Sequence, residues 1–427
     1  MRTDARSPCA RAVLLILAAL LFLLTARAAD AEEPRLEFPN GLEAAASAAS
    51  LDLSALSHED VDEVLPLLGQ MDNLRHIDLG ADRAVTAFER EGTPLPSPAL
   101  VWSEDYYAHL ELPAPETEDE RLSWADIRKI VEAVPEAEVE YRFHISDLRF
   151  STLSEKLDIN HIRFDDEGAL IREILPCMQK LQLLDMDYCG VSSEVMAEIR
   201  SAYPDVKVVW RVWFGPSYDR LSVRTDVECV LASSIYGLSD ENSGDLRYCT
   251  RVKYLDVGHS NIEHIDFVRD MRELEVLVVS LSDYCDLSPV AGLEKLEYFE
   301  GCNSTYTGVI DLTPLSTCPN LRHINVCFLN AVEGYESLAA LKGLERLWFG
   351  SATPVPQSAV EALRSALPNA VINNTEPTGC LGTWRYDENG ANLPRYALLR
   401  EQFGYSNYDT AVARVYNDPK YFSPNRD

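Results

Sequence analysis

A short hydrophobic phrase of the form L-x-x-L-x-L, in which L is leucine or another residue that is usually apolar, recurs along the chain. Its seven clearest copies begin at Leu74, Leu181, Val252, Leu274, Leu296, Leu321 and Leu344. The last five copies begin 22, 22, 25 and 23 residues apart. The alternation within each copy has the two-residue period of a β-strand. The pattern predicts one short strand per copy, with the L positions in the core and the third and fifth positions on the other face.

A longer repetition with a spacing of 69 residues connects the less regular half of the chain to the regular half. The segment 124–143 parallels the segment 192–212, and Pro135 and Pro204 fall in register. Apolar side chains in the second copy recur at four-residue spacing, as on one helix face, at Val195, Ile199 and Tyr203. Because proline cannot continue a helix, each copy predicts a helix, a proline that ends it, and a strand.

The period of the short phrase lies within the roughly 20–29 residues of leucine-rich repeats, and the chain resembles this family. The resemblance implies an α/β fold, a leucine-rich repeat solenoid (horseshoe) with parallel strands on the concave face and helices outside. We expect this solenoid over residues 40–376, with irregular insertions near 84–120 and 215–246. An aromatic C-terminal cap or tail is expected over 377–427, and it is similar to the tails of exported bacterial repeat proteins.

The family usually has Asn or Cys at the ninth repeat position, inside the turn that follows the strand. This sequence has other residues there in four repeats, namely Ser260, Ser282, Ser304 and Leu329. The turn geometry is therefore an open question.

The amino terminus has the layout of a secretory signal peptide. Arg2, Arg6 and Arg11 precede an apolar run over residues 12–24, and small residues follow. Thirteen apolar residues are too few to span a bilayer comfortably. We predict a signal peptide over residues 1–28 and a secreted or cell-surface, extracytoplasmic protein with no membrane insertion after cleavage. An uncleaved amino-terminal anchor is the alternative.

The chain is strongly acidic, with a formal net charge of −31. The predicted signal peptide carries four arginines and one aspartate, so the charge without it is −34. Phosphate backbones and anionic lipid surfaces would be repelled, which argues against nucleic acid and bare membranes as partners. Basic proteins, cationic peptides or polymers and divalent cations remain open as partners, and so does a charge that serves solubility alone.

The cysteines recur at repeat positions rather than in metal-binding spacing. Cys177, Cys249 and Cys318 each stand three or four residues before a repeat strand, and Cys189 occupies a ninth position. Such recurrence predicts small buried core residues. No C-x-x-C is present, which argues against a structural zinc site.

Motifs of common enzymes are missing from the sequence. There is no G-x-S-x-G, H-E-x-x-H, P-loop or G-x-G-x-x-G. Cys302 or Cys327 could pair with His323 as nucleophile and base, but nothing supplies the orienting third group. Asp240 and Glu241 offer oxygen ligands without a D-x-D-x-D-G loop, which favours a solvated turn. We predict no catalysis, no cofactor and no metal site.

The third and fifth positions of the strands define the candidate binding surface. Aromatic and arginine side chains on an exposed face often anchor protein interfaces. The predicted binding residues are Tyr254, Asp256, Tyr298, Glu300, His323, Asn325, Arg346 and Trp348.

The function that these patterns favour is non-catalytic binding of another macromolecule, most naturally a protein ligand, through the concave face and flanking loops. One alternative is a structural component of the cell envelope. Another is a carbohydrate-binding or carbohydrate-degrading protein that uses Trp348, Tyr298 and neighbouring acids. The ligand and the oligomeric state are not determined by the sequence.

Overall fold

The computed structural model describes residues 34–82, 108–109 and 122–404, apart from short gaps at 147, 165–166, 218–219, 236, 378 and 380–381. The chain divides into two compact units. The first unit holds Met1–Phe88, Leu112–Glu155 and Ala169–Leu181, and the second holds Glu89–Glu111, Lys156–Gly168 and Gln182–Asp427. The predicted signal peptide, most of the predicted insertion near 84–120 and the end of the tail lie outside the described residues.

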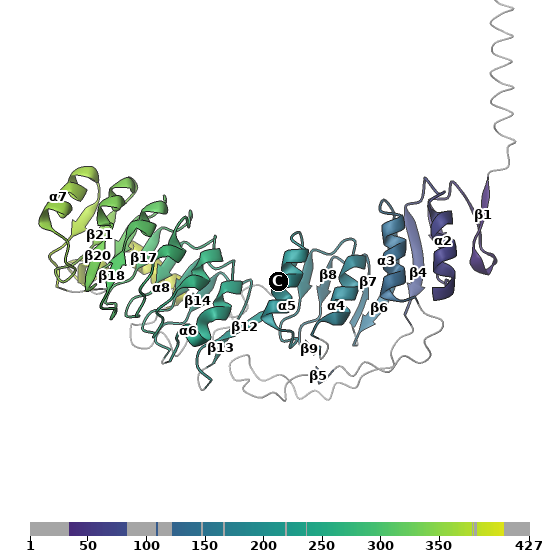
Figure 1. Ribbon diagram of the computed structural model, residues 1–427, viewed down its shortest axis with the longest axis horizontal. Coiled ribbons are helices and arrows are strands. Elements are labelled where there is room, and N and C mark those ends of the chain that lie inside the picture. The colour runs from purple at the N-terminus through teal and green to yellow at the C-terminus, as the bar shows by residue number, and fades with distance from the viewer. Residues whose placement is uncertain are drawn as a thin grey trace, which may run out of the picture. The chain divides into compact units, whose positions relative to one another are not determined.

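The described elements of the first unit begin with a hairpin and continue with helix and strand pairs (Figure 1). They are β1 (Arg35–Glu37), η1 (Pro39–Gly41), β2 (Glu43–Ala45), β3 (Ser50–Asp52), η2 (His58–Asp60), α2 (Val61–Leu68), β4 (His76–Ala81), α3 (Trp124–Ala133), β6 (Glu138–Ile145), β7 (Leu148–Ser151), α4 (Ala169–Ile174) and η4 (Leu175–Cys177), where η denotes a 3₁₀ helix. Strands β3, β4 and β6 are parallel, and β7 returns antiparallel to β6.

The second unit begins with β5 (Ala108–His109), β8 (Lys156–Asp158), β9 (Ile162–Arg163), β10 (Leu183–Asp185), α5 (Ser193–Ala202), β11 (Lys207–Val209), β12 (Arg211–Phe214) and β13 (Leu221–Arg224). It continues with β14 (Cys229–Leu231), α6 (Asp240–Ser243), η5 (Gly244–Tyr248), β15 (Tyr254–Asp256), η6 (Asp266–Asp270), β16 (Val276–Val278), η7 (Ser288–Val290), β17 (Tyr298–Glu300) and β18 (Val309–Asp311). The last elements are η8 (Thr313–Thr317), β19 (His323–Asn325), β20 (Ala331–Glu333), η9 (Tyr335–Ala340), β21 (Arg346–Trp348), α7 (Gln357–Ala366), β22 (Val371–Asn373), η10 (Gly382–Trp384) and α8 (Pro394–Phe403).

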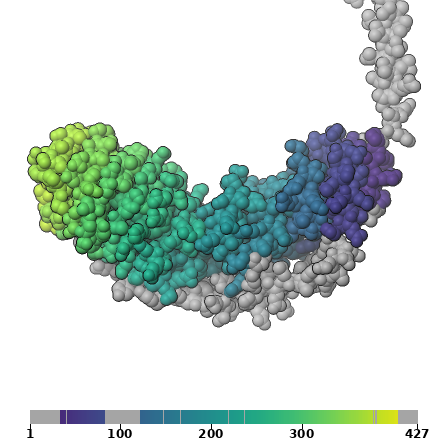
Figure 2. All heavy atoms as spheres, in the orientation of Figure 1, coloured from purple at the N-terminus to yellow at the C-terminus, as the bar shows by residue number. Residues whose placement is uncertain are grey.

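The main sheet of the second unit confirms one strand per repeat. Its seven strands lie in the order β14-β15-β16-β17-β19-β21-β22, and every neighbouring pair is parallel. The middle residues of successive strands are buried partners in register, as Leu277, Phe299 and Ile324 illustrate. In Figure 2 the colours of the second unit follow one another in chain order from teal to yellow-green, as stacked coils require. A single coil could not bury this apolar face, so stacking supplies the core.

The predicted duplication is also present. Helices α3 and α5 are each followed by a proline, at Pro135 and Pro204, and then by the strands β6 and β11. Each copy also contains an antiparallel hairpin, β6–β7 or β12–β13. Between β14 and β21 the connections are mainly 3₁₀ helices. Their rise of about 2.0 Å per residue covers the return path with fewer residues than an α-helix needs, which suits the short repeats.

Each regular coil turns through a residue with left-handed backbone geometry, three residues after its strand ends. Seven such residues have φ between 53° and 64°: His161, Tyr188, Ser234, His259, Leu281, Asn303 and Phe328. Five of these residues donate a backbone N–H to a carbonyl of the next coil, as from Leu281 to Cys302 at 2.9 Å and from Asn303 to Cys327 at 2.8 Å. Since non-glycine residues rarely adopt this conformation, its recurrence marks equivalent repeat positions.

Serine hydroxyls satisfy the turn where the family usually has Asn or Cys. The Ser260 hydroxyl donates to the Val257 carbonyl at 2.8 Å and lies 3.1 Å from the Ser282 hydroxyl. Ser304 donates to the Tyr284 carbonyl at 3.4 Å. All three serines are buried, so this hydrogen-bonded ladder maintains the turns without the usual side chains.

The cysteine prediction is confirmed for the repeat positions. Cys177, Cys189, Cys249 and Cys318 are buried, and each of the cysteines that the structure describes is a free thiol. Burial raises the pKa of the Cys177 and Cys249 thiols to about 12. Such thiols are inert core residues rather than nucleophiles or metal ligands.

The structure differs from the expectation of an irregular insertion near 215–246. This segment contains β13, β14, α6 and η5, and β14 is the first strand of the main sheet. In the other expected insertion, Ala108–His109 pairs in parallel with β9. The turn-rich sequence of 215–246 concealed a complete repeat, whose phrase begins at Val227 and has the small Ala232 at its last apolar position.

Replacing Leu277 by alanine tests the stacked core. Leu277 has no exposed surface and lies at the middle of β16, so the cavity should lower the free energy of unfolding by about 2–5 kcal/mol in denaturant titrations. Val309→Ala is the control, because Val309 is 52% exposed and should change stability by less than about 0.5 kcal/mol. Equal effects of the two changes would contradict the assigned register.

Candidate binding surfaces

The eight predicted binding residues lie on one face of the main sheet. Tyr254 and Asp256 are on β15, Tyr298 and Glu300 on β17, His323 and Asn325 on β19, and Arg346 and Trp348 on β21. The parallel register places equivalent residues of β17, β19 and β21 side by side. Strand β16, with Val276 and Val278, separates the first pair of residues from the others.

The expectation that this face is exposed is wrong. Six of the eight residues are buried, and only Tyr254 and Arg346 keep intermediate exposure. The cover is the chain's own carboxy-terminal segment, comprising η10, Arg385 and α8, which we call the C-terminal cover. Helix α8, drawn in yellow, packs against β14 (Figure 1). The described residues of the expected C-terminal cap or tail therefore lie on the strand face.

Glu300 is the centre of the contact between the sheet and the C-terminal cover. Its carboxylate accepts hydrogen bonds from the Trp384 indole N–H at 2.6 Å and from the hydroxyl of Tyr298. It also forms an ion pair with Arg385. The Glu300 and Arg385 side chains are 1% and 9% exposed. A buried charge needs such a partner and further hydrogen bonds, so this ion pair fixes where the cover binds.

Aromatic rings extend the contact around Trp384. Its ring centroid lies 5.5 Å from that of Tyr298, 5.4 Å from that of Trp348 and 6.3 Å from that of His323. The Trp384 N–H also donates to the Tyr298 hydroxyl oxygen at 2.9 Å. Rings at these separations add favourable aromatic contacts to the burial of their apolar surface.

Arg346 and Asn325 fasten the segment that leads into the C-terminal cover. Arg346 donates to the Thr383 carbonyl at 2.5 Å, and its guanidinium lies 4.2 Å from the centre of the Trp348 ring. Asn325 donates to the Gly379 carbonyl at 3.3 Å. The two side chains thus hold backbone carbonyls of the covering segment over the sheet.

At the other end of the cover, Tyr254 meets α8. The rings of Tyr254 and Phe403 lie 6.3 Å apart in an edge-to-face arrangement, and the Tyr254 hydroxyl donates to Glu275 at 3.1 Å. Asp256 instead accepts from the Gly258 backbone N–H at 2.9 Å, which is a local turn contact. The structure therefore brings Tyr298, Glu300, His323, Asn325, Arg346 and Trp348 together around the cover and leaves Asp256 in a structural role.

Burial sets the protonation of this face. It lowers the pKa of His323 to about 4 against the weaker opposing effect of Glu345, and it raises the pKa of Tyr298 well above its usual value, as Glu300 also does. His323 is therefore a neutral imidazole and Tyr298 a neutral phenol near pH 7. This environment is a packed core with polar anchors, and it offers no base poised for catalysis.

Trp384 and Arg385 are the functional contacts that sequence reasoning missed. The signal available was the aromatic density of the tail and the Trp-Arg pair that follows Gly382. Repeat periodicity cannot show that a segment outside the repeats returns to pack on the strand face. The two residues lie more than 80 positions from Glu300 in the chain.

A second strand face, in the first unit, carries side chains that none of the described residues buries. The side chains opposite the core on β3, β4 and β6 are Ser50, Asp52, His76, Asp78, Glu138 and Glu140, all of which are exposed or of intermediate exposure. The register aligns Asp52, Asp78 and Glu140 across the three strands. Adjacent strands are about 4.8 Å apart, so these carboxylates form a ladder. We call this surface the acidic strand face.

Few cations balance the acidic strand face. Arg142 lies 2.8 Å from Asp78 and 3.1 Å from Glu140, and Lys180 lies 2.5 Å from Glu138. Hydrogen bonds from Ser54 lower the pKa of Asp52, and Lys180 lowers that of Glu138, so both side chains are charged near pH 7. Within the described part of the chain, these four carboxylates face two permanent cations and the His76 ring, which lies 3.8 Å from Glu140, and an exposed excess of negative charge is left.

Metal-ligating side chains gather at one place among the described residues. Asp240, Glu263 and His264 offer ligand atoms within 4.8 Å of one another, on exposed turns of the second unit. Asp240 was noted in the sequence as part of an acidic turn, but the histidine beside it comes from the next coil.

Short parallel strands at a 22–25-residue spacing, stacked through left-handed turns, define a leucine-rich repeat solenoid. No protein-family model matches the chain, and no curated protein matches it. Among the described residues, no helix has the length and apolar character that crossing a membrane requires.

Similar folds occur among solved structures of bacterial proteins. An internalin C2 from Listeria monocytogenes is 16% identical over 36% of this chain and 76% of its own, with a TM-score of 0.26. An internalin, InlF, from the same species is 14% identical over 60% and 79%, with a TM-score of 0.27. A leucine-rich repeat protein of Leptospira interrogans is 14% identical over 72% and 74%, with a TM-score of 0.30. The description of the fold rests on the repeat geometry itself.

Removing one partner of the buried ion pair should strongly destabilise the second unit. Arg385→Met leaves the Glu300 charge buried, so the free energy of unfolding should fall by about 3–5 kcal/mol. Glu300→Gln combined with Arg385→Met should cost less than the sum of the single changes, measured as a double-mutant cycle. Arg322→Met is the control, because Arg322 and its partner Glu345 are 51% and 53% exposed and the loss should be below about 1 kcal/mol. If the losses in the free energy of unfolding from the two single changes added up to the loss in the double variant, the pairing of Glu300 with Arg385 would be contradicted.

The neutral state of His323 predicts a specific pH dependence. Its pKa of about 4 in the folded chain lies below the ordinary value of 6.5, so between these pH values only the unfolded chain binds the proton. Stability should therefore fall as the pH drops from 6.5 to 4, by up to about 3 kcal/mol from this residue. His323→Gln should remove that part of the slope in denaturation curves measured across the window. An unchanged slope would show that His323 titrates freely.

Proposed function

We propose that this protein is an exported, non-catalytic leucine-rich repeat protein that binds a basic segment of another protein through the acidic strand face of its first unit. The carboxylate ladder of Asp52, Asp78 and Glu140 is the observation that carries the proposal. It is the part of the predicted strand surface that is exposed, charged and ordered by the sheet register.

The covered face of the second unit supports this choice by exclusion. Tyr298 and Trp348 are 3% and 2% exposed, so neither ring can stack on a sugar or insert into a partner while the C-terminal cover is in place. The buried residues of this set that lie against the cover would have to lose it before they could contact a ligand, namely Tyr298, Glu300, His323, Asn325 and Trp348. Their role in binding a partner remains a prediction that requires such a displacement.

Charge complementarity suits an extended basic peptide. Strand-face carboxylates lie about 4.8 Å apart across the sheet, and alternate residues of an extended chain lie about 6.6 Å apart on one side, a difference that long Lys and Arg side chains can span. The overall charge of −31 would also attract a cationic partner from a distance. Because this attraction between the protein and a basic peptide is electrostatic, we expect the peptide to associate faster and bind more tightly at low ionic strength.

The absence of catalysis is part of the same proposal. The buried thiols described above have raised pKa values, and His323 lies in a packed core. Cys285 lies 3.8 Å from the His264 ring, but burial and the carboxylates of Asp286 and Glu263 raise its pKa. A catalytic thiol needs the opposite, because the thiolate is the nucleophile.

Charge reversal on the acidic strand face tests the proposal. Asp52→Lys together with Glu138→Lys should weaken binding of a fluorescent Lys/Arg-rich peptide by about tenfold or more in anisotropy titrations at low salt. Added salt should reduce the difference between the variant and the unmodified protein.

Asp62→Lys together with Glu132→Lys is the matched control. These exposed carboxylates lie on the helices α2 and α3 of the same unit, each already pairs with a cation, and the change in net charge is identical. Equal weakening by both double variants would show that only the overall charge attracts the peptide, and it would overturn the proposed binding face.

A further inference from the structure

A histidine, a cysteine and two carboxylates meet on the turns of three consecutive coils in the second unit. Asp240 begins α6, Glu263 and His264 follow β15, and Cys285 follows β16. Backbone bonds fix the spacing of these turns, since Cys285 donates from its N–H to the Glu263 carbonyl at 3.1 Å. The side chains are held beside one another by the repeat itself, although 45 residues separate Asp240 from Cys285.

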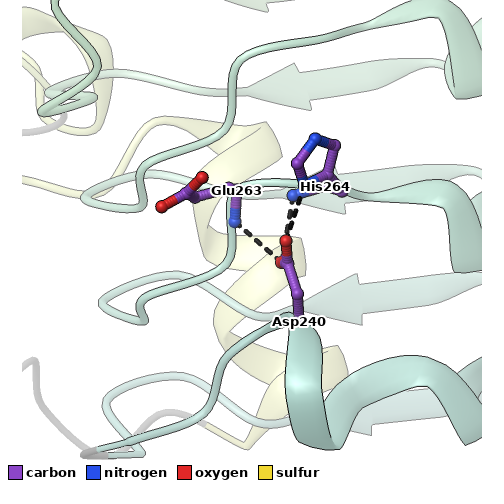
Figure 3. A group of neighbouring side chains, drawn as sticks. All are labelled: Asp240, Glu263 and His264. Carbon is purple, nitrogen blue, oxygen red and sulfur yellow. Dashed lines mark hydrogen bonds and ion pairs between the residues drawn. The ribbon is translucent and has the colours of Figure 1, made fainter.

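Asp240 orients the His264 ring. One of its carboxylate oxygens accepts the backbone N–H groups of Glu263 and His264 at 2.9 and 3.0 Å, and the other lies 2.6 Å from His264 Nδ1 (Figure 3). With Nδ1 engaged by a carboxylate, the remaining ring nitrogen Nε2 is the one available to bind a metal. Carboxylate–histidine pairs of this kind are the usual outer-shell support of metal-bound imidazoles.

The Cys285 sulfur lies on the side of the ring where a metal would bind. Cys285 Sγ is 3.8 Å from His264 Nε2. In tetrahedral zinc sites the Zn–N distance is about 2.0–2.1 Å and the Zn–S distance about 2.3 Å, which places the two ligand atoms about 3.6 Å apart. The observed separation needs only a small adjustment of exposed side chains to admit an ion between the two atoms.

Glu263 offers a carboxylate on the same turn as His264, and rotation of this exposed side chain would bring it to an ion held between His264 and Cys285. A carboxylate oxygen of Glu263 lies within 4.8 Å of the ligand atoms of Asp240 and His264. Asp286 and Asp266 are close enough to act electrostatically on Cys285 and His264, respectively. A site surrounded by this many carboxylates favours a divalent cation over an anion.

We propose that His264 Nε2, Cys285 Sγ and a Glu263 carboxylate oxygen bind a zinc ion, with Asp240 as the outer-shell partner of the imidazole and water in the fourth position. The mixture of one thiolate, one imidazole and one carboxylate selects zinc over magnesium or calcium, which prefer oxygen ligands throughout. Binding displaces the proton of the Cys285 thiol to solvent. The ion would join two adjacent turns directly and a third through Asp240, so it would stabilise this part of the stack.

This site is independent of the acidic strand face, which belongs to the other unit. Sequence analysis predicted no metal site, because the ligands proposed here are not arranged in a C-x-x-C or H-E-x-x-H spacing. Only the register of the coils brings the three turns together.

Cobalt and zinc titrations of the full-length exported protein test the inference directly. With the thiol kept reduced by a phosphine, the protein should bind about one Zn²⁺ per chain by calorimetry. Co²⁺ should produce a thiolate-to-metal charge-transfer band and the intense visible bands of tetrahedral cobalt. Zn²⁺ should also raise the melting temperature of the protein.

Substitutions assign the ligands. Cys285→Ser and His264→Gln should each abolish the cobalt spectrum and weaken zinc binding by more than the roughly 10- to 100-fold that loss of an outer-shell partner produces. Asp240→Asn should weaken zinc binding by roughly 10- to 100-fold and leave the cobalt spectrum in place. His58→Gln is the control, because His58 forms the same 2.6 Å bond to a carboxylate, that of Asp126, in the first unit.

Two results would overturn the inference. One is a protein whose zinc affinity is unchanged by Cys285→Ser and His264→Gln, which would indicate adventitious binding to surface carboxylates. The other is a cobalt complex without the thiolate band. All four substituted residues are on exposed or partly exposed turns, and circular dichroism spectra that match the unmodified protein will show that loss of binding does not reflect unfolding.

Discussion

The buried contact of Glu300 with Arg385 and Trp384 determines which strand side chains of the second unit are enclosed and which reach the surface. A carboxylate on the middle strand of a repeat sheet would normally face solvent. Here it is 1% exposed, and the Arg385 guanidinium and the Trp384 indole are the partners that make its burial tolerable. Once this contact forms, the neighbouring side chains of β19 and β21 are enclosed as well. The strand face of the second unit thereby becomes a second core layer.

That constraint separates the roles of the two units. The acidic strand face of the first unit keeps its charged side chains at the surface. In the second unit, the aromatic and polar strand residues instead contact the C-terminal cover of the same chain. Asp185 of the second unit, an acidic strand residue outside the cover, is also paired within the chain, with Arg224 at 2.9 Å. The proposed binding face is therefore a different surface from the one that the richest aromatic strands suggested.

The fold was largely predictable from the sequence, and the site was not. The L-x-x-L-x-L phrase and the 69-residue duplication identify the strands, the helices α3 and α5 and the buried thiols, because these features follow from local periodicity. The repeat at Val227 was harder to see because turn residues surround it. The side of the sheet occupied by Tyr298 and Trp348 was predicted correctly, but their exposure was not. Exposure depends on where Trp384 and α8 return in space, and no local pattern records that contact.

Solvent labelling of individual aromatic side chains tests the central claim most directly. In hydroxyl-radical footprinting of the full-length protein, Tyr298, Trp348 and Trp384 should be oxidised several-fold more slowly than Trp213 and Tyr335, which have intermediate exposure. Arg385→Met should increase the labelling of all three by loosening the C-terminal cover. If Tyr298 and Trp348 are oxidised as readily as Trp213 in the unmodified protein, the strand face is open in solution and the account is contradicted.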